Sequence, residues 1–290
     1  MRTQVVEETG SLKKNRSKIM VLWDTVMMTL RSFKNFRAYK PFFLFFFMQV
    51  TVLMGLVFFL FPPFSWVFLP FSKMIAGEAI VHYPNNMIVL PQLFDLLSMV
   101  LSGIVGIIIS GYASHVFFFA YPNNEDSISL RAVLAKYPYL FLIWCLQMAL
   151  ILGSFHGLAE LASTYPAAGK YFGPVRTLLV VLLSSVFAYT TVLIVIQREN
   201  VLNAVKESFV LFKEHTVITF LAVSIPVILH LPYQFVMSKT PSIARNLNPE
   251  VIPAIIAAGM LFSMLTNFFS ISTIVQVYLK KQMVEGKISH

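Results

Sequence analysis

Six long stretches of the chain contain no Asp, Glu, Lys or Arg, and each is long enough to cross a lipid bilayer. A helix needs about 20 mostly apolar residues to span the hydrocarbon core. The bilayer interior offers no water to backbone N–H and C=O groups, so a spanning segment must be helical or part of a closed barrel. The six stretches cover residues 41–61, 96–120, 137–159, 177–197, 216–237 and 251–279.

The composition agrees with a chain that is solvated by lipid. Hydrophobic residues make up 57% of the chain and charged residues 12%, against roughly 25% charge in average soluble proteins. A β-barrel would instead show alternating segments of about ten residues, and the sequence has none. We therefore predict an all-α polytopic membrane protein with an N-terminal segment (1–40), a six-helix transmembrane domain (41–279) and a C-terminal tail (280–290).

The basic residues are distributed unevenly between the connections, which predicts an orientation. Nine lie before residue 41, two in 121–136, three in 198–215 and three after residue 279, so 17 of the 22 fall on one side of the predicted membrane. Lys and Arg are enriched in cytoplasmic loops. The prediction is a multi-pass protein of the bacterial inner membrane with both termini in the cytoplasm. Its net charge of +9 then favours anionic lipids as partners rather than nucleic acid.

Three segments at the predicted cytoplasmic side have the pattern of amphipathic surface helices, namely residues 17–40, 127–136 and 199–213. Each has apolar residues at helical spacing with basic residues beside them. A basic residue near an anionic surface contributes about 1 kcal/mol to membrane binding. The predicted membrane-surface residues are Lys18, Trp23, Arg31, Lys34, Arg37, Lys206 and Lys213.

Each surface segment directly precedes a span, so the chain reads as three units of one surface helix and two spans. Duplicated units are common in membrane folds. Two interpretations stay open: a true threefold duplication, or a shared topology that arises without one.

Residues 192–230 carry a resemblance to a known group. A span ends in Val-Ile-Gln-Arg-Glu (195–199), an amphipathic segment follows, and a new span begins near residue 216. This arrangement resembles bacterial six-span proteins that include the membrane domain attached to some glycerophosphodiester phosphodiesterases. No phosphodiesterase domain is present in this sequence, so the resemblance implies the topology and not that activity.

A second resemblance rests on His-Gly-Leu-Ala-Glu at 156–160. It is similar to the His-Gly-x-x-Glu motif of stage II sporulation protein M-like membrane proteins, and Asn85, Asn86 and the glycines at 103, 106 and 111 occur in the order of that family. This resemblance implies a role in remodelling the cell envelope together with a membrane-protein partner.

Ionisable side chains at membrane depth are costly and often functional. The candidate ligand or ion-binding residues are Asp95, His156, Glu160, Arg176 and His230, which all approach the predicted non-cytoplasmic face. Several interpretations stay open for them: hydrated headgroup-level residues, an ion-paired plug, a proton relay or a metal site of nitrogen and oxygen ligands. We expect no bound metal and no cofactor.

Two further patterns concern helix packing. Small residues recur on the second span, with Ser102, Gly106, Ser110 and Ser114 at every fourth position and Gly103 and Gly111 beside them, which predicts a close internal neighbour. Pro226 and Pro232 lie inside the fifth span, where each frees a backbone carbonyl. They indicate either a structural kink or carbonyls that coordinate a cation.

No catalytic motif or soluble catalytic domain is recognisable, so we expect a protein that is not an enzyme. The first hypothesis is a scaffold, assembly factor or subunit of a cell-envelope complex. The alternative is a small-solute or lipid transporter with a site near the non-cytoplasmic face. A minor alternative is an intramembrane metal-dependent enzyme built on His156, Glu160 and His230.

Overall fold

The computed structural model describes residues 36–60, 85–119, 129–165 and 169–284, together with 23, 25, 27–31, 65–66, 70, 73–74 and 77–78. Over these residues the chain is helical and has no β-strand. The helices are α2 (Phe36–Leu60), α4 (Asn85–Leu101), α5 (Ile107–Phe119), α6 (Leu130–Leu134), α7 (Tyr137–Thr164), α8 (Gly169–Phe187), α9 (Thr190–Val192), α10 (Val201–Glu214), α11 (Thr216–Ser238), α12 (Thr240–Asn246) and α13 (Val251–Val284), with π-helical turns η2 (Ser102–Gly106) and η5 (Leu193–Gln197).

The all-α polytopic fold class is confirmed. In the described part of the chain, six helices are long and apolar enough to cross a membrane: Ala38–Phe59, Asn85–Phe119, Tyr137–Thr164, Tyr171–Gln197, Thr216–Ser238 and Val251–Met283. They match the six predicted stretches in order. The second and sixth run to 35 and 33 residues, which exceeds the minimum for a span and is accommodated by tilt or by protrusion from the bilayer.

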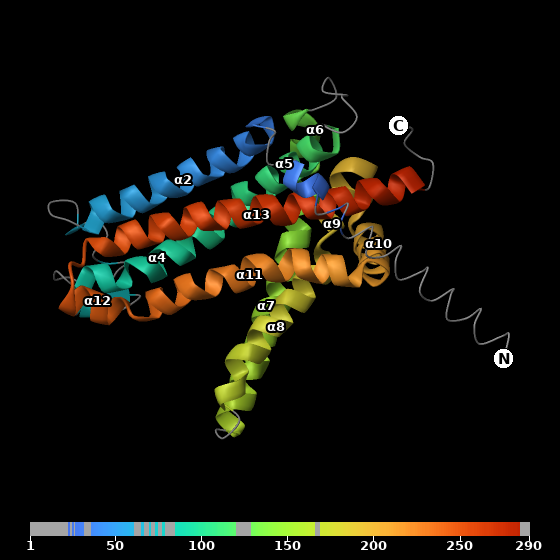
Figure 1. Cartoon of the computed structure of the whole chain (residues 1–290). Coiled ribbons are helices and arrows are strands. Elements are labelled where there is room, and N and C mark those ends of the chain that lie inside the picture. Colours follow the sequence, from blue (N-terminus) through green and yellow to red (C-terminus); the bar gives the residue numbers. More distant parts are fainter. Residues whose placement is uncertain are drawn as a thin grey trace.

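The helices form two parts (Figure 1). α2, α4–α5, α11 and α13 lie side by side and make up what we call the bundle. α7 and α8 run together as a helical hairpin that stands away from the bundle at a steep angle. The hairpin joins the bundle only at its base, where α9, α10 and α11 meet it.

One end of the bundle, which we call the charged end, carries the basic connections. α6, α10, the beginning of α7 and the end of α13 meet there (Figure 1). These elements and their flanks contain Arg131, Lys136, Arg198, Lys206, Lys213, Lys280 and Lys281. The structure thus brings basic residues from distant parts of the chain to one side, as the alternation of six spans requires.

The core of the charged end is organised around Phe268 on α13, whose side chain has no exposed surface. The ring of Tyr39 stacks on it at a centroid distance of 4.3 Å, and Phe117 meets it edge-on at 5.0 Å. Aromatic pairs of this kind contribute about 0.5–1.5 kcal/mol beyond the area they bury. They join α2, α5 and α13, so the first, second and sixth spans pack as one unit.

Some predicted boundaries differ from the structure. The second span begins at Asn85 with α4 rather than at residue 96, so Asp95 lies ten residues inside the helix and not at its start. Pro91 falls within α4, where it removes one donor without ending the helix. At the other end, α13 continues to Val284, five residues beyond the predicted last span, because Lys280 to Met283 continue the helix with good helix formers.

The predicted surface helix at 199–213 is confirmed as a helix, α10, with an Asn200 side chain that caps its start by accepting the Asn203 N–H at 2.9 Å. Lys206 and Lys213 are exposed on it. Of the segment 127–136, residues 130–134 form α6. In the N-terminal segment Trp23 and Arg31 are exposed, Arg37 belongs to α2, and Lys18 and Lys34 lie outside the described residues.

The small-residue face of the second span receives close neighbours, as predicted. A Cβ atom on Gly103 would lie 2.6 Å from the indole ring of Trp144 on α7, and one on Gly111 would lie 3.2 Å from Leu140. Gly106 faces Phe45 of α2. The absence of side chains at these positions lets α7 approach the bundle along its first two turns before the hairpin diverges.

We expect Gly103→Val to destabilise the protein by about 1–3 kcal/mol, because the new side chain overlaps the Trp144 ring. The measurement is the unfolding temperature of the purified protein in detergent. Gly157→Val on the same hairpin is the control, since no atom lies within 4 Å of a Cβ built there. Equal losses in both variants would show that the contact with Trp144 has no special role.

Candidate functional site in the transmembrane region

The structure does not bring the five predicted ligand-binding residues together. His156 and Glu160 lie on α7 and Arg176 on α8, in the part of the hairpin that stands away from the bundle (Figure 1). Asp95 and His230 lie in the bundle, on α4 and α11. The described residues contain no group of three or more His, Cys, Asp or Glu side chains that could hold a metal ion.

The hairpin residues have surface positions. His156, Glu160 and Arg176 are all exposed, and the Arg176 guanidinium lies 3.8 Å from the centre of the Phe155 ring. In the bundle, the His230 ring packs against Tyr233 at a centroid distance of 4.7 Å. Stacking on aromatic faces is a common arrangement for such side chains at the membrane interface, and it assigns no ligand to any of the five.

A cavity of about 310 Å³ lies instead at the base of the hairpin, between α5, α7, α8, α9, α11 and α13. Its walls mix apolar side chains with hydroxyl and amide groups, and the described residues that line it include no charged or histidine side chain. The polar side chains are Ser110, Ser114, Gln147, Ser184, Thr191, Asn267 and Ser270. We call this space the apex cavity, because it lies where the hairpin and the bundle begin to diverge.

The hydrogen bonds explain why this position is unusual. Most hydroxyl groups of the spanning helices donate back to a carbonyl of their own helix, as Thr51 does to Phe47 at 2.9 Å and Thr273 to Phe269 at 2.8 Å. Such back-bonding satisfies the group inside a bilayer. At the cavity, Gln147 Nε2 instead donates across helices to Ser184 Oγ at 3.2 Å. The Asn267 side chain is exposed and lines the cavity, and its Nδ2 donates to the Ser263 hydroxyl of its own helix at 3.4 Å.

Hydrogen bonds between helices also hold the base of the hairpin. The hydroxyls of Tyr189 and Thr219 lie 2.7 Å apart in a fully buried position and tie the end of the hairpin to α11. The Ser208 hydroxyl of α10 accepts the Tyr189 N–H at 3.2 Å and donates to the Val186 carbonyl at 2.5 Å. The surface helix α10 is therefore bonded directly to the backbone break between α8 and α9.

Irregular backbone surrounds the same region. Pro226, which is inside α11, lines the cavity, and so do Thr191 and Val192, which immediately precede the π-helical turn η5. The turn ends at Arg198, which is in the left-handed region with φ 60°. Proline inside a helix frees a carbonyl, and π-helical turns occur often at functional sites. Both features therefore adjoin the apex cavity.

No family model matches the chain, and no curated protein and no solved structure matches it either. The resemblances to the membrane domain of glycerophosphodiester phosphodiesterases and to stage II sporulation protein M-like proteins thus stay predictions.

The apex cavity has no strong signal in the sequence. Its polar residues are neutral, and serine, threonine, asparagine and glutamine are common enough in spanning helices that they do not mark a site as ionisable residues do. Two signals were nonetheless present in the sequence: the Ser110 and Ser114 positions of the small-residue face, and the proline at 226. What was missing was the information that α7, α8 and α13 meet these residues from the other side.

We expect Ser208→Ala to destabilise the base of the hairpin by about 1–3 kcal/mol, because it leaves the Tyr189 N–H and the Val186 carbonyl unbonded in a buried position. The matched control is Ser185→Ala. Ser185 is equally buried, but its hydroxyl donates only to Val181 within its own helix. Hydrogen exchange should accelerate at the Tyr189 amide in the first variant and not in the second. Faster exchange in both, or in neither, would contradict this account of the joint.

Proposed function

We propose that the protein binds and moves a small uncharged polar molecule, or the hydroxyl-rich part of a lipid, within the membrane. The observation that carries the proposal is the apex cavity, with hydroxyl and amide groups from α5, α7, α8, α9 and α13 around one space at membrane depth. Some of these groups bond within the protein, as Ser114 does to the Ser110 carbonyl at 2.8 Å and Gln147 to Ser184 at 3.2 Å. Hydroxyl and amide groups keep further donor and acceptor capacity after one such bond, so a set of them around one space suits a polar occupant.

The chemistry of the walls restricts this occupant. A charged solute at this depth would need a counter-charge, and no Asp, Glu, Lys, Arg or His is among the described residues that line the cavity. Serine, threonine, asparagine and glutamine both donate and accept hydrogen bonds, as hydroxyl groups do. The apolar walls, which include Phe187 and Val223, suit the carbon skeleton of a polyol or a lipid. This supports the transporter alternative, with its site moved from the non-cytoplasmic face to the hairpin base.

The hairpin diverges from the bundle beyond its base (Figure 1), and this would let a polar molecule reach the apex cavity from the side. Pro226 and the η5 turn would allow α11 and the end of the fourth span to adjust around it.

The test uses the full-length protein in liposomes with two probes, glycerol followed by light scattering and a fluorescent glucosyl-diacylglycerol followed by quenching from outside. We expect faster movement of one of them than in protein-free liposomes. Ser270→Leu, which fills the cavity, and Asn267→Leu should each reduce the rate by about tenfold, the effect of roughly 1.4 kcal/mol.

The matched control for these variants is Thr51→Val, because Thr51 is an exposed hydroxyl residue on α2 that bonds only to its own helix. It should leave the rate unchanged. Rates equal to those of protein-free liposomes for both probes would overturn the proposal, and so would equal losses in Thr51→Val and Ser270→Leu.

A second candidate function, a scaffold or subunit of an envelope complex, is favoured by the hairpin itself. It places exposed His156 and Glu160 on a helix whose apolar side chains Leu150 and Leu152 are also exposed. A projecting helix that exposes polar and apolar side chains together suits packing against a partner helix that supplies a polar group.

For this candidate, a photo-crosslinking residue at position 160 should produce one defined protein adduct in cells, and the same residue at position 51 on α2 should not. Glu160→Ala should weaken co-purification of that partner in mild detergent. Adducts with lipid only, or the same adducts from both positions, would rule out a docking role for the hairpin.

A further inference from the structure

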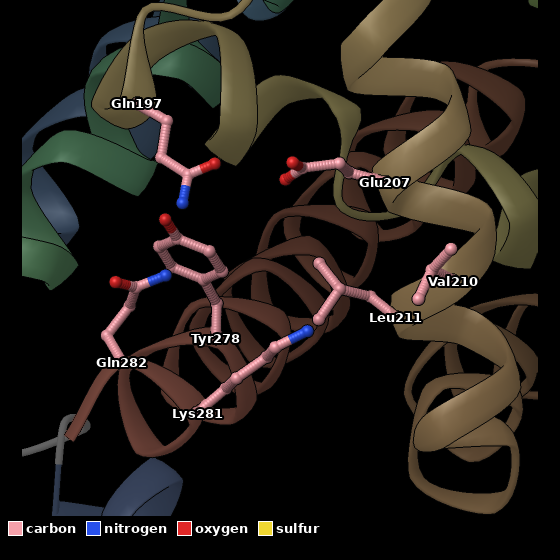
Figure 2. Close-up of a pocket in the computed structure, with 7 residues that line it drawn as sticks. All are labelled: Gln197, Glu207, Val210, Leu211, Tyr278, Lys281 and Gln282. Atoms are coloured by element: carbon pink, nitrogen blue, oxygen red, sulfur yellow. The ribbon is translucent and has the colours of Figure 1, made fainter. Parts of the chain in front are cut away.

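A second pocket, of about 310 Å³, lies at the charged end between α10, the end of η5 and the last turns of α13. Figure 2 shows the side chains that line it pointing into the space between these elements. They are Gln197, Glu207, Val210, Leu211, Tyr278, Lys281 and Gln282. Ligand sites for small molecules begin at roughly this size.

The pocket holds fixed charges of both signs. The Lys281 ammonium forms an ion pair with the Glu214 carboxylate at 3.0 Å, which fixes its position beside the pocket. The Glu207 carboxylate extends from α10 toward the Gln197 amide (Figure 2), and no ion-pair partner for it exists among the described residues. Two carboxylates and one ammonium therefore flank this space. His215 adds no charge at neutral pH, because burial lowers the pKa of its imidazole.

Neutral hydrogen-bonding groups complete the walls on the α13 side. Tyr278 and Gln282 are only 2% and 7% exposed, yet both line the pocket, so the surface they keep is directed into it. Phenol and amide groups beside an ammonium are the donors that bind phosphate oxygens. Val210 and Leu211 form an apolar wall along α10.

We propose that this pocket binds ethanolamine phosphate chemistry, with a primary ammonium against Glu207 and a phosphate against Lys281. Glu207, for which the described residues supply no ion-pair partner, would pair with a cation. The Lys281 ammonium, held at 3.0 Å from Glu214, would place a positive charge beside the phosphate. The position supports a lipid source. The amphipathic helix α10 and the end of the last span frame the pocket at the level where headgroups lie, and Val210 and Leu211 would contact the glycerol and first methylenes.

This inference is independent of the apex cavity, which has a different lining with no charged side chain among its described residues. A negative result in the transport assay would not contradict the proposal for this pocket, and a lack of headgroup selectivity here would not contradict the transport proposal. The two proposals can therefore be separated by experiment.

The test is a titration of the full-length protein in detergent with phosphatidylethanolamine, phosphatidylcholine and phosphatidylglycerol, with bound lipid counted by native mass spectrometry. Phosphatidylethanolamine should bind about tenfold or more tightly than the other two. Choline cannot donate a hydrogen bond to Glu207, and phosphatidylglycerol has no ammonium. Glu207→Gln should abolish this preference, while the unfolding temperature stays unchanged because Glu207 is exposed.

The matched control is Glu199→Gln, which removes an acidic charge just before α10, where the carboxylate accepts from Asn203 at 3.3 Å outside the pocket. It should keep the preference. Competition by free ethanolamine phosphate would support the site and show that the headgroup alone is sufficient. A lack of competition with the lipid preference intact would support a site that requires the lipid. Equal binding of the three lipids, or an unchanged preference in Glu207→Gln, would overturn the proposal.

Discussion

A polar group inside a bilayer has no water to bond to, and this constraint determines which hydrogen-bond partners the polar side chains of the spanning helices have. Hydroxyl groups that stand alone, such as Thr51 and Ser185, donate to a carbonyl of their own helix. Polar side chains that bond across helices gather at the base of the hairpin, where Gln147 meets Ser184 and Tyr189 meets Thr219. The hairpin is attached by these bonds, and the cavity lies among them.

The same attachment links the membrane surface to the membrane interior. Ser208 belongs to the surface helix α10, and its hydroxyl bonds to the backbone on both sides of the break between α8 and α9. The outer side of α10 carries Lys206 and Lys213 beside exposed apolar residues, with the Lys213 ammonium 4.4 Å from the centre of the Phe209 ring. The surface helix α10 is therefore bonded to the same helix break from which Phe187 and Ala188 line the apex cavity.

The two pockets differ in chemistry because they differ in depth. The apex cavity is surrounded by six helical segments, where only neutral polar groups are tolerated without a counter-charge. The pocket at the charged end lies at the surface, where Glu207 and Glu214 are exposed and Lys281 is partly exposed. The two proposed ligands, a lipid headgroup and a hydroxyl-rich group, match this difference between a charged lining and a neutral polar lining.

The sequence by itself determined the six spans, their order, the separation of basic residues and the existence of the helix at 201–214. Each of these depends on the lipid bilayer as solvent, because the length of an apolar segment and the positions of its flanking charges decide whether and how it spans. The small-residue face on the second span was also predictable, since glycines at 103 and 111 permit close approach in any packing.

Only the tertiary structure decided where the functional groups meet. The five ionisable residues share a predicted depth, yet the divergence of the hairpin separates His156, Glu160 and Arg176 from Asp95 and His230. Conversely, Ser114, Gln147 and Asn267 are far apart in the chain and uncharged, and they line one cavity. Depth in a membrane is a property of a single helix and can be read along the chain. The neighbour of a side chain depends on how helices cross, which is set by packing and by the few polar bonds between them.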